Sequence, residues 1–194
     1  KVPVLPVLRQ RAVLWFFAAA FFHVLSHIGI YVFFSLYLDS LGYSKTMIGL
    51  LWAVSVIVEI GWFFTQSRWL PMLSLTGWLV LCSAAMVLRM GITASSASVL
   101  VALLLAQALH AFTFATHHTV CIALLSHHFP GRLRGRGQAL FTVIGYGFGG
   151  VTGVLAGGAL ASRLGFELMY GAATVLALVA TLCAWRMHRL ETGR

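Results

Sequence analysis

Charged side chains, and acids above all, are scarce in this chain of 194 residues. Only 9% of the residues are charged and four of them are Asp or Glu, whereas 60% are hydrophobic. A soluble domain of this length carries far more charge, so the composition predicts a polytopic membrane protein whose direct surroundings are the lipid bilayer. The formal net charge of +9 does not indicate a nucleic-acid partner, because the Lys and Arg residues lie in short loops between apolar runs, where membrane topology accounts for them.

Cysteine is also rare, and motifs of catalysis are missing. Cys82, Cys121 and Cys183 fall inside apolar runs, where a thiol acts as a small apolar side chain, so we expect neither a disulfide framework nor a zinc cluster. The chain contains no nucleophile elbow, P-loop or acid pair, and we therefore expect no enzyme activity. No secretory signal peptide is visible, and the start at Lys1 rather than Met predicts that an N-terminal part is missing.

Six apolar runs are each near or above the roughly 20 residues that a helix needs to cross a bilayer. They cover residues 12–38, 46–66, 72–92, 98–126, 138–161 and 166–186. The sequence thus predicts an all-α fold, a six-helix transmembrane bundle.

The basic residues between these runs are unevenly distributed over the two sides of the membrane. One side receives ten of them, namely Lys1, Arg9, Arg11, Arg68, Arg132, Arg134, Arg136, Arg186, Arg189 and Arg194, and the other side receives Lys45 and Arg163. Because cytoplasmic loops carry the excess of Lys and Arg, both termini are predicted to be cytoplasmic. Arg89 remains, inside the third span, and a lone arginine there needs a reason.

Polar side chains recur at helical spacing within the spans, where they must face protein or a water-filled cavity. In the first span His23, His27 and Tyr31 form one stripe, and in the second Glu59 is the sole acid inside any span. One face of the fourth span carries Gln107, His110, Phe114, His117 and His118.

Depth places several of these residues near the middle of the membrane. At about 1.5 Å per residue, Glu59 lies roughly 20 Å and His110 roughly 18 Å below the outer surface, and His23 lies about 16 Å from the other side. We therefore predict that Glu59 and His110 come within reach of each other. A buried acid must be protonated or paired, so a substrate or proton site is favoured for Glu59 over a role in packing alone. Four histidines approach the cytoplasmic surface and are predicted to be interfacial, namely His117, His118, His127 and His128.

Arg89 admits two interpretations on sequence grounds. Near the outer end of its span, its long side chain either reaches the headgroups as an anchor or serves as a ligand for an anion.

The histidines and glycines have further interpretations. His23 and His27 have the spacing of metal ligands and, with His110, of a haem site, but no carboxylate or cysteine completes a set and no cofactor is expected. The fifth span contains GxxxG steps at 145–149, 149–153 and 153–157, which predict close helix contacts. The sixth span has no buried charge and is predicted to be a lipid-facing support.

Several segments together resemble the C-terminal six-helix half of a major facilitator superfamily transporter, in the branch of phenylpropionate transporter-like proteins. The similarity is carried by His23-Val-Leu-Ser-His27 with Tyr31-Val-Phe-Phe-Ser-Leu-Tyr-Leu, Gly42-Tyr-Ser-Lys-Thr-Met-Ile-Gly-Leu-Leu-Trp52, Gln107-Ala-Leu-His-Ala-Phe-Thr-Phe114, Phe129-Pro-Gly-Arg-Leu-Arg-Gly-Arg-Gly-Gln-Ala-Leu-Phe141 and the glycine-rich fifth span. The resemblance covers nearly the whole chain, as residues 1–194 of a twelve-helix fold whose N-terminal half is absent.

The order Glu59, Arg89, His110 also resembles lactose permease and its relatives, which carry Glu, Arg and His on corresponding helices for substrate binding and proton coupling. Two features differ from those patterns. The permeases have a Glu three residues after the His, where this chain has Thr113, and the loop after the second span keeps only Arg68 of the superfamily's G-x-x-x-D-R/K-x-G-R pattern.

The resemblance implies a secondary transporter of the plasma (inner) membrane that moves a small organic anion, such as an aromatic carboxylate, by proton symport. Its partners are then the substrate, the coupling proton and the missing half. The expected substrate and proton site contains Glu59, His110, Arg89, His23, His27, Gln107 and Tyr31. The alternatives are a proton-coupled sugar or nucleoside permease and a structural or assembly membrane protein.

Overall fold

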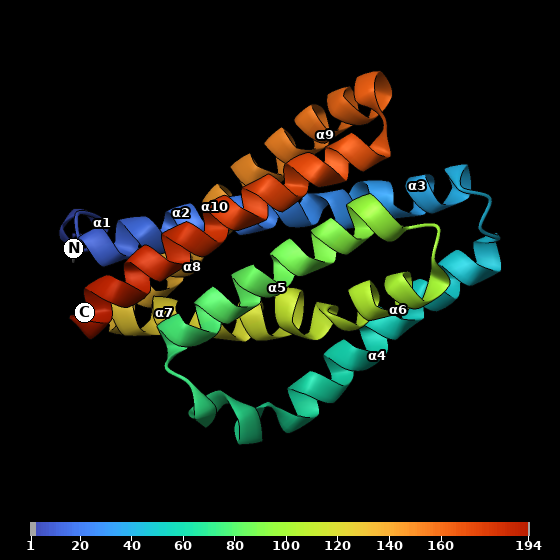
Figure 1. The fold of residues 1–194 in the computed structure, drawn as a ribbon. Coiled ribbons are helices and arrows are strands. Elements are labelled where there is room, and N and C mark those ends of the chain that lie inside the picture. The colour runs from blue at the N-terminus through green and yellow to red at the C-terminus, as the bar shows by residue number, and fades with distance from the viewer. Residues whose placement is uncertain (1–2, 194) are drawn as a thin grey trace.

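Six long apolar helices form the computed structural model, which describes residues 3–193 (Figure 1). The spans are Arg11–Ser40, Lys45–Met72, Leu75–Ser96, Leu100–His128, Gly131–Leu164 and Phe166–Thr192. The all-α fold and the six-helix membrane bundle are thereby confirmed. Every helical span extends past the C-terminal end of the apolar run that predicted it. The helix continues there through polar residues, which the apolar interior of a bilayer would exclude.

Most spans consist of more than one helical segment. After the short α1 (Leu5–Leu8), the first span comprises α2 (Arg11–Ile28), η1 (Gly29–Phe33) and α3 (Phe34–Ser40), and the second comprises α4 (Lys45–Trp69) and η2 (Leu70–Met72). The third is α5 (Leu75–Ser96), and the fourth comprises α6 (Leu100–Ala108), η3 (Ala111–Thr116) and α7 (His117–His128). The fifth comprises η4 (Gly131–Leu133), α8 (Arg134–Phe141), η5 (Thr142–Gly149) and α9 (Gly150–Leu164), and the sixth is α10 (Phe166–Thr192).

The helix ends follow local side-chain chemistry. Ser44 accepts a hydrogen bond from the backbone N–H of Met47 at 3.1 Å, and Ser74 accepts one from Gly77 at 3.1 Å, so each serine caps the helix that follows it. Gly165, between α9 and α10, has a φ of +89°, a conformation that glycine adopts without strain.

The sixth span packs on its neighbours along one side and exposes Leu168, Leu178 and Leu182 on another, so its role as a lipid-facing support stays a prediction. α10 packs along both α5 and α2, while α4 packs on the fourth span (Figure 1). Tyr170, Ala177 and Ala180 of α10 are buried. Small residues such as Ala177 and Ala180 allow neighbouring helices to approach closely, which is how α10 packs against both α5 and α2.

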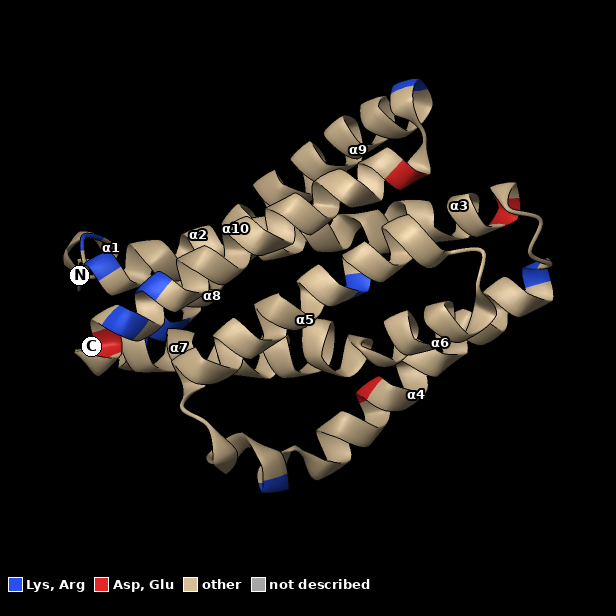
Figure 2. Ribbon diagram, in the orientation of Figure 1, with Lys and Arg blue, Asp and Glu red and all other residues tan. Residues whose placement is uncertain are grey.

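Basic residues gather at the end of the bundle where both termini lie, and few are found at the opposite end (Figure 2). This arrangement agrees with the alternation of loops predicted from the sequence. Lys1 and Arg194, which were assigned to the basic end, lie outside the described residues.

Three spans contain a π-helical segment, which no sequence pattern predicted. These segments are η1, η3 and η5. A π turn inserts a residue into the helical hydrogen-bond ladder and leaves backbone groups free for other partners. The Gly29 carbonyl in η1 accepts a hydrogen bond from Tyr170 at 2.7 Å, and the Thr113 carbonyl in η3 accepts one from His23 at 2.7 Å. The irregular turns thus join spans to each other.

The glycines of the fifth span lie against the first span, as the GxxxG steps predict. A Cβ added to Gly153 would lie 2.9 Å from Ile28, and one added to Gly157 would lie 2.7 Å from Phe33. The absence of side chains at these positions therefore lets the two helices approach closely.

Candidate functional site

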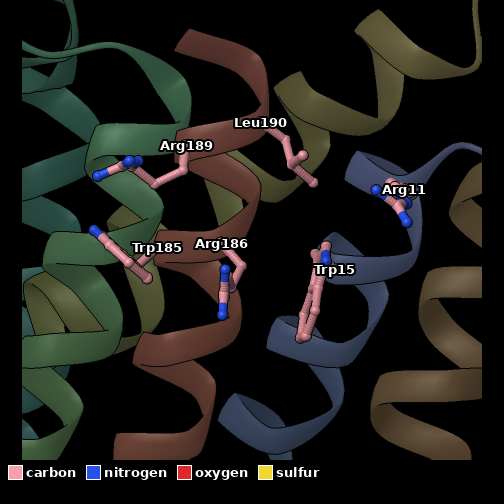
Figure 3. A pocket seen from close by; sticks show the side chains of 6 residues that line it. All are labelled: Arg11, Trp15, Trp185, Arg186, Arg189 and Leu190. Carbon is pink, nitrogen blue, oxygen red and sulfur yellow. The ribbon is translucent and has the colours of Figure 1, made fainter. Parts of the chain in front are cut away.

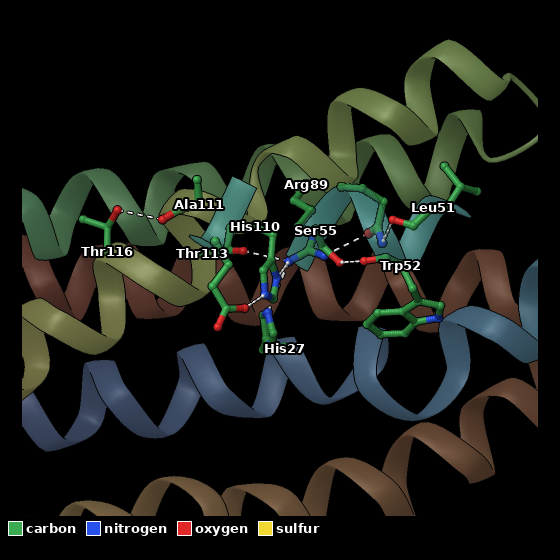
Figure 4. A network of polar contacts seen from close by, with 11 residues as sticks. His27, Leu51, Trp52, Ser55, Arg89, His110, Ala111, Thr113 and Thr116 are labelled. Atoms are coloured by element: carbon green, nitrogen blue, oxygen red, sulfur yellow. Dashed lines mark hydrogen bonds and ion pairs between the residues drawn. The ribbon is translucent and has the colours of Figure 1, made fainter. Parts of the chain in front are cut away.

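The guanidinium of Arg89, on α5, is completely buried and lies at the centre of a polar cluster (Figure 4). Its Nη1 donates to Thr113 Oγ1 at 2.8 Å and also lies 3.0 Å from His110 Nδ1 and 3.2 Å from His27 Nε2. Its Nη2 donates to Gln107 Oε1 at 2.9 Å. The interpretation of Arg89 as a headgroup anchor is therefore wrong, because the side chain points into the bundle. We refer to Arg89, Thr113, His110, His27, Gln107 and Glu59 as the polar cluster.

The Nη1 atom of Arg89 has more acceptors than hydrogens. A guanidinium nitrogen at this position carries two hydrogens, and three acceptors lie within hydrogen-bonding distance. His27 is the most distant of the three, so its contact is the weakest. The Nε atom of Arg89 is buried and has no partner among residues 3–193. The arginine can therefore exchange partners without losing all of its hydrogen bonds.

His110 connects Arg89 to the carboxylate of Glu59. His110 Nε2 lies 3.0 Å from Glu59 Oε2, which confirms the prediction that these two side chains reach each other. Because Arg89 is a donor only, Nδ1 of His110 must accept from it, and the ring proton then resides on Nε2 and is donated to Glu59. The imidazole in this arrangement is neutral. It accepts a hydrogen bond from the cationic Arg89 and donates one to the anionic Glu59.

Gln107 fixes the other side of the guanidinium. Its amide oxygen accepts from Arg89, and its Nε2 donates to the backbone carbonyl of Leu51 on α4 at 3.0 Å. The amide orientation is thereby determined, since only the oxygen can accept from an arginine. Gln107 joins the third, fourth and second spans at the depth of the cluster.

Two further histidines, His23 and His117, pack beside the cluster. His23 and His117 stack with ring centroids 3.6 Å apart and planes 5° apart, and His117 is buried. The prediction that His117 is interfacial was therefore wrong, because the ring lies on the helix face that it shares with His110 and is covered by α2. Within residues 3–193 no group of three or more His, Cys, Asp or Glu side chains is arranged to hold a metal.

One edge of the cluster is open. Tyr31 is 41% exposed, and the side chain of Glu59 is 27% exposed. The ring of Tyr31 packs on His27 with centroids 4.4 Å apart and on Phe114 with centroids 6.3 Å apart. Further toward the basic end, Phe114 and Tyr146 line a shallow depression together with His118 and Gln138. A ligand approaching this edge therefore meets aromatic rings first and the Glu59 carboxylate beside them.

The structure brings the predicted site residues together. Glu59, Arg89, His110, Gln107 and His27 share one network, His23 is joined to it through the Thr113 carbonyl, and Tyr31 covers its edge. Sequence reasoning missed Thr113 as a member, because it was noted only as a replacement for a permease Glu. Its position three residues after His110, on the same helix face, was the available signal.

Comparison with known proteins gives a family and no individual relative. The model of the MFS_1 like family matches residues 2–172. Neither a search of curated proteins nor a search of solved structures found a match.

Proposed function

Because the chain belongs to the MFS_1 like family, a membrane-transporter family, we propose that it is the C-terminal half of a twelve-helix symporter for a small organic anion and a proton. The half-transporter assignment is supported by the six-helix bundle, since transporters of this kind are built from repeated helical halves with a binding site between them. We further propose that the protein lies in the plasma (inner) membrane with both termini in the cytoplasm.

One observation carries the proposal: the buried Arg89 is linked through a neutral His110 to Glu59, the acid at mid-span. Asp39, Glu167 and Glu191 lie at helix ends instead. The cluster is thus neutral overall when Glu59 is ionised. Buried charge is costly without compensation, so any event that neutralises Glu59 leaves the positive charge of Arg89 uncompensated.

Coupling follows from this charge balance. When Glu59 takes up a proton, its hydrogen bond with His110 loses its charge assistance and weakens. The uncompensated Arg89 then favours binding of an anion, and a bound anion in turn favours the protonated form of Glu59. Proton and anion therefore bind cooperatively, with the same coupling free energy in both directions.

The geometry also supports a carboxylate as the anion. The surplus of acceptors at Nη1 means that a substrate oxygen can replace the His27 contact while Arg89 keeps its bonds to Thr113 and Gln107. A planar fork of N–H groups matches a carboxylate in shape. Tyr31 and Phe114 at the open edge favour an aromatic substrate, since rings pack on rings.

The decisive experiment compares Glu59→Gln with Glu167→Gln in the full-length transporter reconstituted in vesicles. Both substitutions remove one acidic charge, but Glu167 lies in the first turn of α10, away from the cluster. We expect Glu59→Gln to bind and exchange an aromatic carboxylate such as phenylpropionate but to lose uphill accumulation driven by a proton gradient. Glu167→Gln should keep both activities.

Uphill accumulation that survives in Glu59→Gln would refute the role of Glu59 as the coupling residue. Failure of the unsubstituted protein to move any organic anion, while it moves a neutral sugar or nucleoside, would refute the substrate class.

A further inference from the structure

A concave site lies between the fourth and fifth spans, beside the open edge of the polar cluster. It has a volume of about 430 Å³, within the range of about 300–1,000 Å³ that is common for small-molecule sites. A larger concavity of about 510 Å³ is lined only by the first turns of α2 and the last turns of α10, away from the cluster (Figure 3). We call the smaller site the aromatic depression, and it is lined by Phe114, His118 and Ile122 of the fourth span and by Gln138, Phe141, Thr142 and Tyr146 of the fifth.

Three aromatic rings from two spans line the aromatic depression. Phe141 and Tyr146 lie edge to face, with ring centroids 5.9 Å apart and planes 80° apart. On the fourth span, Phe114 stacks on His118 with ring centroids 6.0 Å apart. A planar ring placed in the depression can therefore pack against rings of both spans, and aromatic pairs prefer such stacked or edge-to-face contacts. The lining thus favours an aromatic ligand.

The aromatic depression offers hydrogen-bond donors but no arginine or lysine among its described lining residues. Within residues 3–193, the side-chain amide of Gln138 and the hydroxyl of Tyr146 make no hydrogen bond. An amide N–H and a phenolic O–H can each donate to a carboxylate. Because hydrogen bonds from neutral donors are weaker than charge-assisted ones, the depression would hold a carboxylate less tightly than Arg89 does.

One ring belongs both to the aromatic depression and to the surroundings of the polar cluster. Phe114 stacks on His110 of the cluster with centroids 5.1 Å apart, and it contacts Tyr31 at the open edge with centroids 6.3 Å apart. From Phe114 the lining continues to His118 and Ile122, which lie four and eight residues later in the direction of the basic end. The two sites are therefore adjacent, and the depression lies on the side of the cluster that the charge distribution assigns to the cytoplasm.

From these observations we propose that the aromatic depression is a second, weaker binding site for the aromatic carboxylate, on the cytoplasmic side of the polar cluster. This inference rests on the proposed function, which supplies the class of substrate. The substrate ring packs between Phe114 and Tyr146, and its carboxylate accepts a hydrogen bond from Gln138. Weak binding suits this position, because a substrate that has left Arg89 must also leave the depression before the next one follows.

The test is equilibrium dialysis of radiolabelled phenylpropionate against the full-length protein in nanodiscs, with empty nanodiscs as the blank. We expect two bound molecules per protein, the second with a dissociation constant roughly tenfold or more above the first, since it has no guanidinium partner. The double substitution Gln138→Leu with Tyr146→Leu should keep the first molecule and weaken the second by roughly tenfold or more. The control is Phe148→Leu with Thr152→Leu, an exposed aromatic and polar pair on the same span but outside the depression, and it should keep both molecules.

Cysteine protection provides a second measurement, which does not require loss of binding. Phenylpropionate at a concentration that fills the second site should slow the reaction of Thr142→Cys with N-ethylmaleimide, because Thr142 lines the depression. The reaction of Val143→Cys, which is exposed on the same turn and does not line the depression, should stay unchanged.

Each alternative outcome has its own signature. One bound molecule without a second would overturn the aromatic depression as a site and leave the proposed function intact. A second molecule that persists after Gln138→Leu with Tyr146→Leu, or that is lost equally in the control pair, would overturn its location, as would equal protection of the two cysteines. A protein that binds no phenylpropionate at all would refute the substrate class of the proposed function, and this inference with it.

Discussion

Two substitutions in the fourth span separate the roles of the acceptors that surround Arg89. Gln107→Leu removes the acceptor of Nη2, and Thr113→Val removes one of three acceptors of Nη1. Both side chains are buried and both replacements are close in size to the original residue. Each substitution removes one acceptor of Arg89, so a count of lost hydrogen bonds predicts equal losses of stability. The number of hydrogens on each Arg89 nitrogen predicts unequal losses.

The expected magnitudes follow from the number of hydrogens on each nitrogen. After Thr113→Val the two hydrogens of Nη1 still have His27 and His110 as acceptors, so the loss is that of an ordinary interhelical bond in a membrane protein, about 0.6 kcal/mol. After Gln107→Leu, Nη2 has lost its acceptor and the Leu51 carbonyl has lost its donor. Hydrogen bonds to charged groups contribute about 1.5–3 kcal/mol, so this variant should be destabilised by roughly 2–4 kcal/mol.

Equilibrium unfolding in bicelles, titrated with a denaturing detergent and followed by tryptophan fluorescence, measures both values. The controls are the unsubstituted protein and Thr174→Val, which removes a hydroxyl bonded only within its own helix. If Thr113→Val unfolds as easily as Gln107→Leu, the surplus of acceptors at Nη1 does not exist in the protein, and the proposed exchange of His27 for a substrate oxygen has no basis.

Two further predictions concern the packing and the topology. Gly153→Ala should destabilise the bundle by about 1–3 kcal/mol, because the new Cβ would lie 2.9 Å from Ile28, whereas Gly171→Ala, with nothing within 4 Å, should be neutral or slightly stabilising in the same assay. Equal effects at both positions would contradict the close contact of the first and fifth spans. A cysteine at Gly42 should react with a membrane-impermeant reagent from outside and one at Gly135 should not; labelling of Gly135 from outside would overturn the predicted orientation.

The sequence was sufficient for the number of spans and for the meeting of Glu59 with His110. Both follow from rules that need only the sequence. Each apolar run of about 20 residues predicts one membrane-spanning helix, and the rise per residue gives the depth of a residue in the membrane. The same rules failed for Arg89. Its depth is compatible with reaching outward or inward, and the choice depends on which neighbours supply acceptors. Those neighbours, Gln107 and Thr113, come from another helix, so the direction of the side chain is a property of packing.

His117 shows that helical spacing and depth gave different answers for one residue. Seven residues separate His117 from His110, so regular helical spacing predicts the same helix face for both side chains. The structure agrees with the face, since His117 is buried and stacks on His23 of the first span. Counting depth along the span placed His117 at the interface, but the depth of a residue does not say whether a neighbouring helix covers it.

The π-helical turns connect the packing of the bundle to the proposed coupling. The Thr113 carbonyl in η3 is held by His23, while the Thr113 hydroxyl is an acceptor for Arg89. One residue in an irregular turn therefore joins the first span to the third. If Arg89 shifts toward a bound anion, its hydrogen bond to this hydroxyl pulls on a turn whose hydrogen bonds are already incomplete, and such turns rearrange more readily than regular helix. The strain of substrate binding would thus be transmitted to the first span through η3, whereas α5, a regular helix packed along α10, keeps the backbone of Arg89 in place.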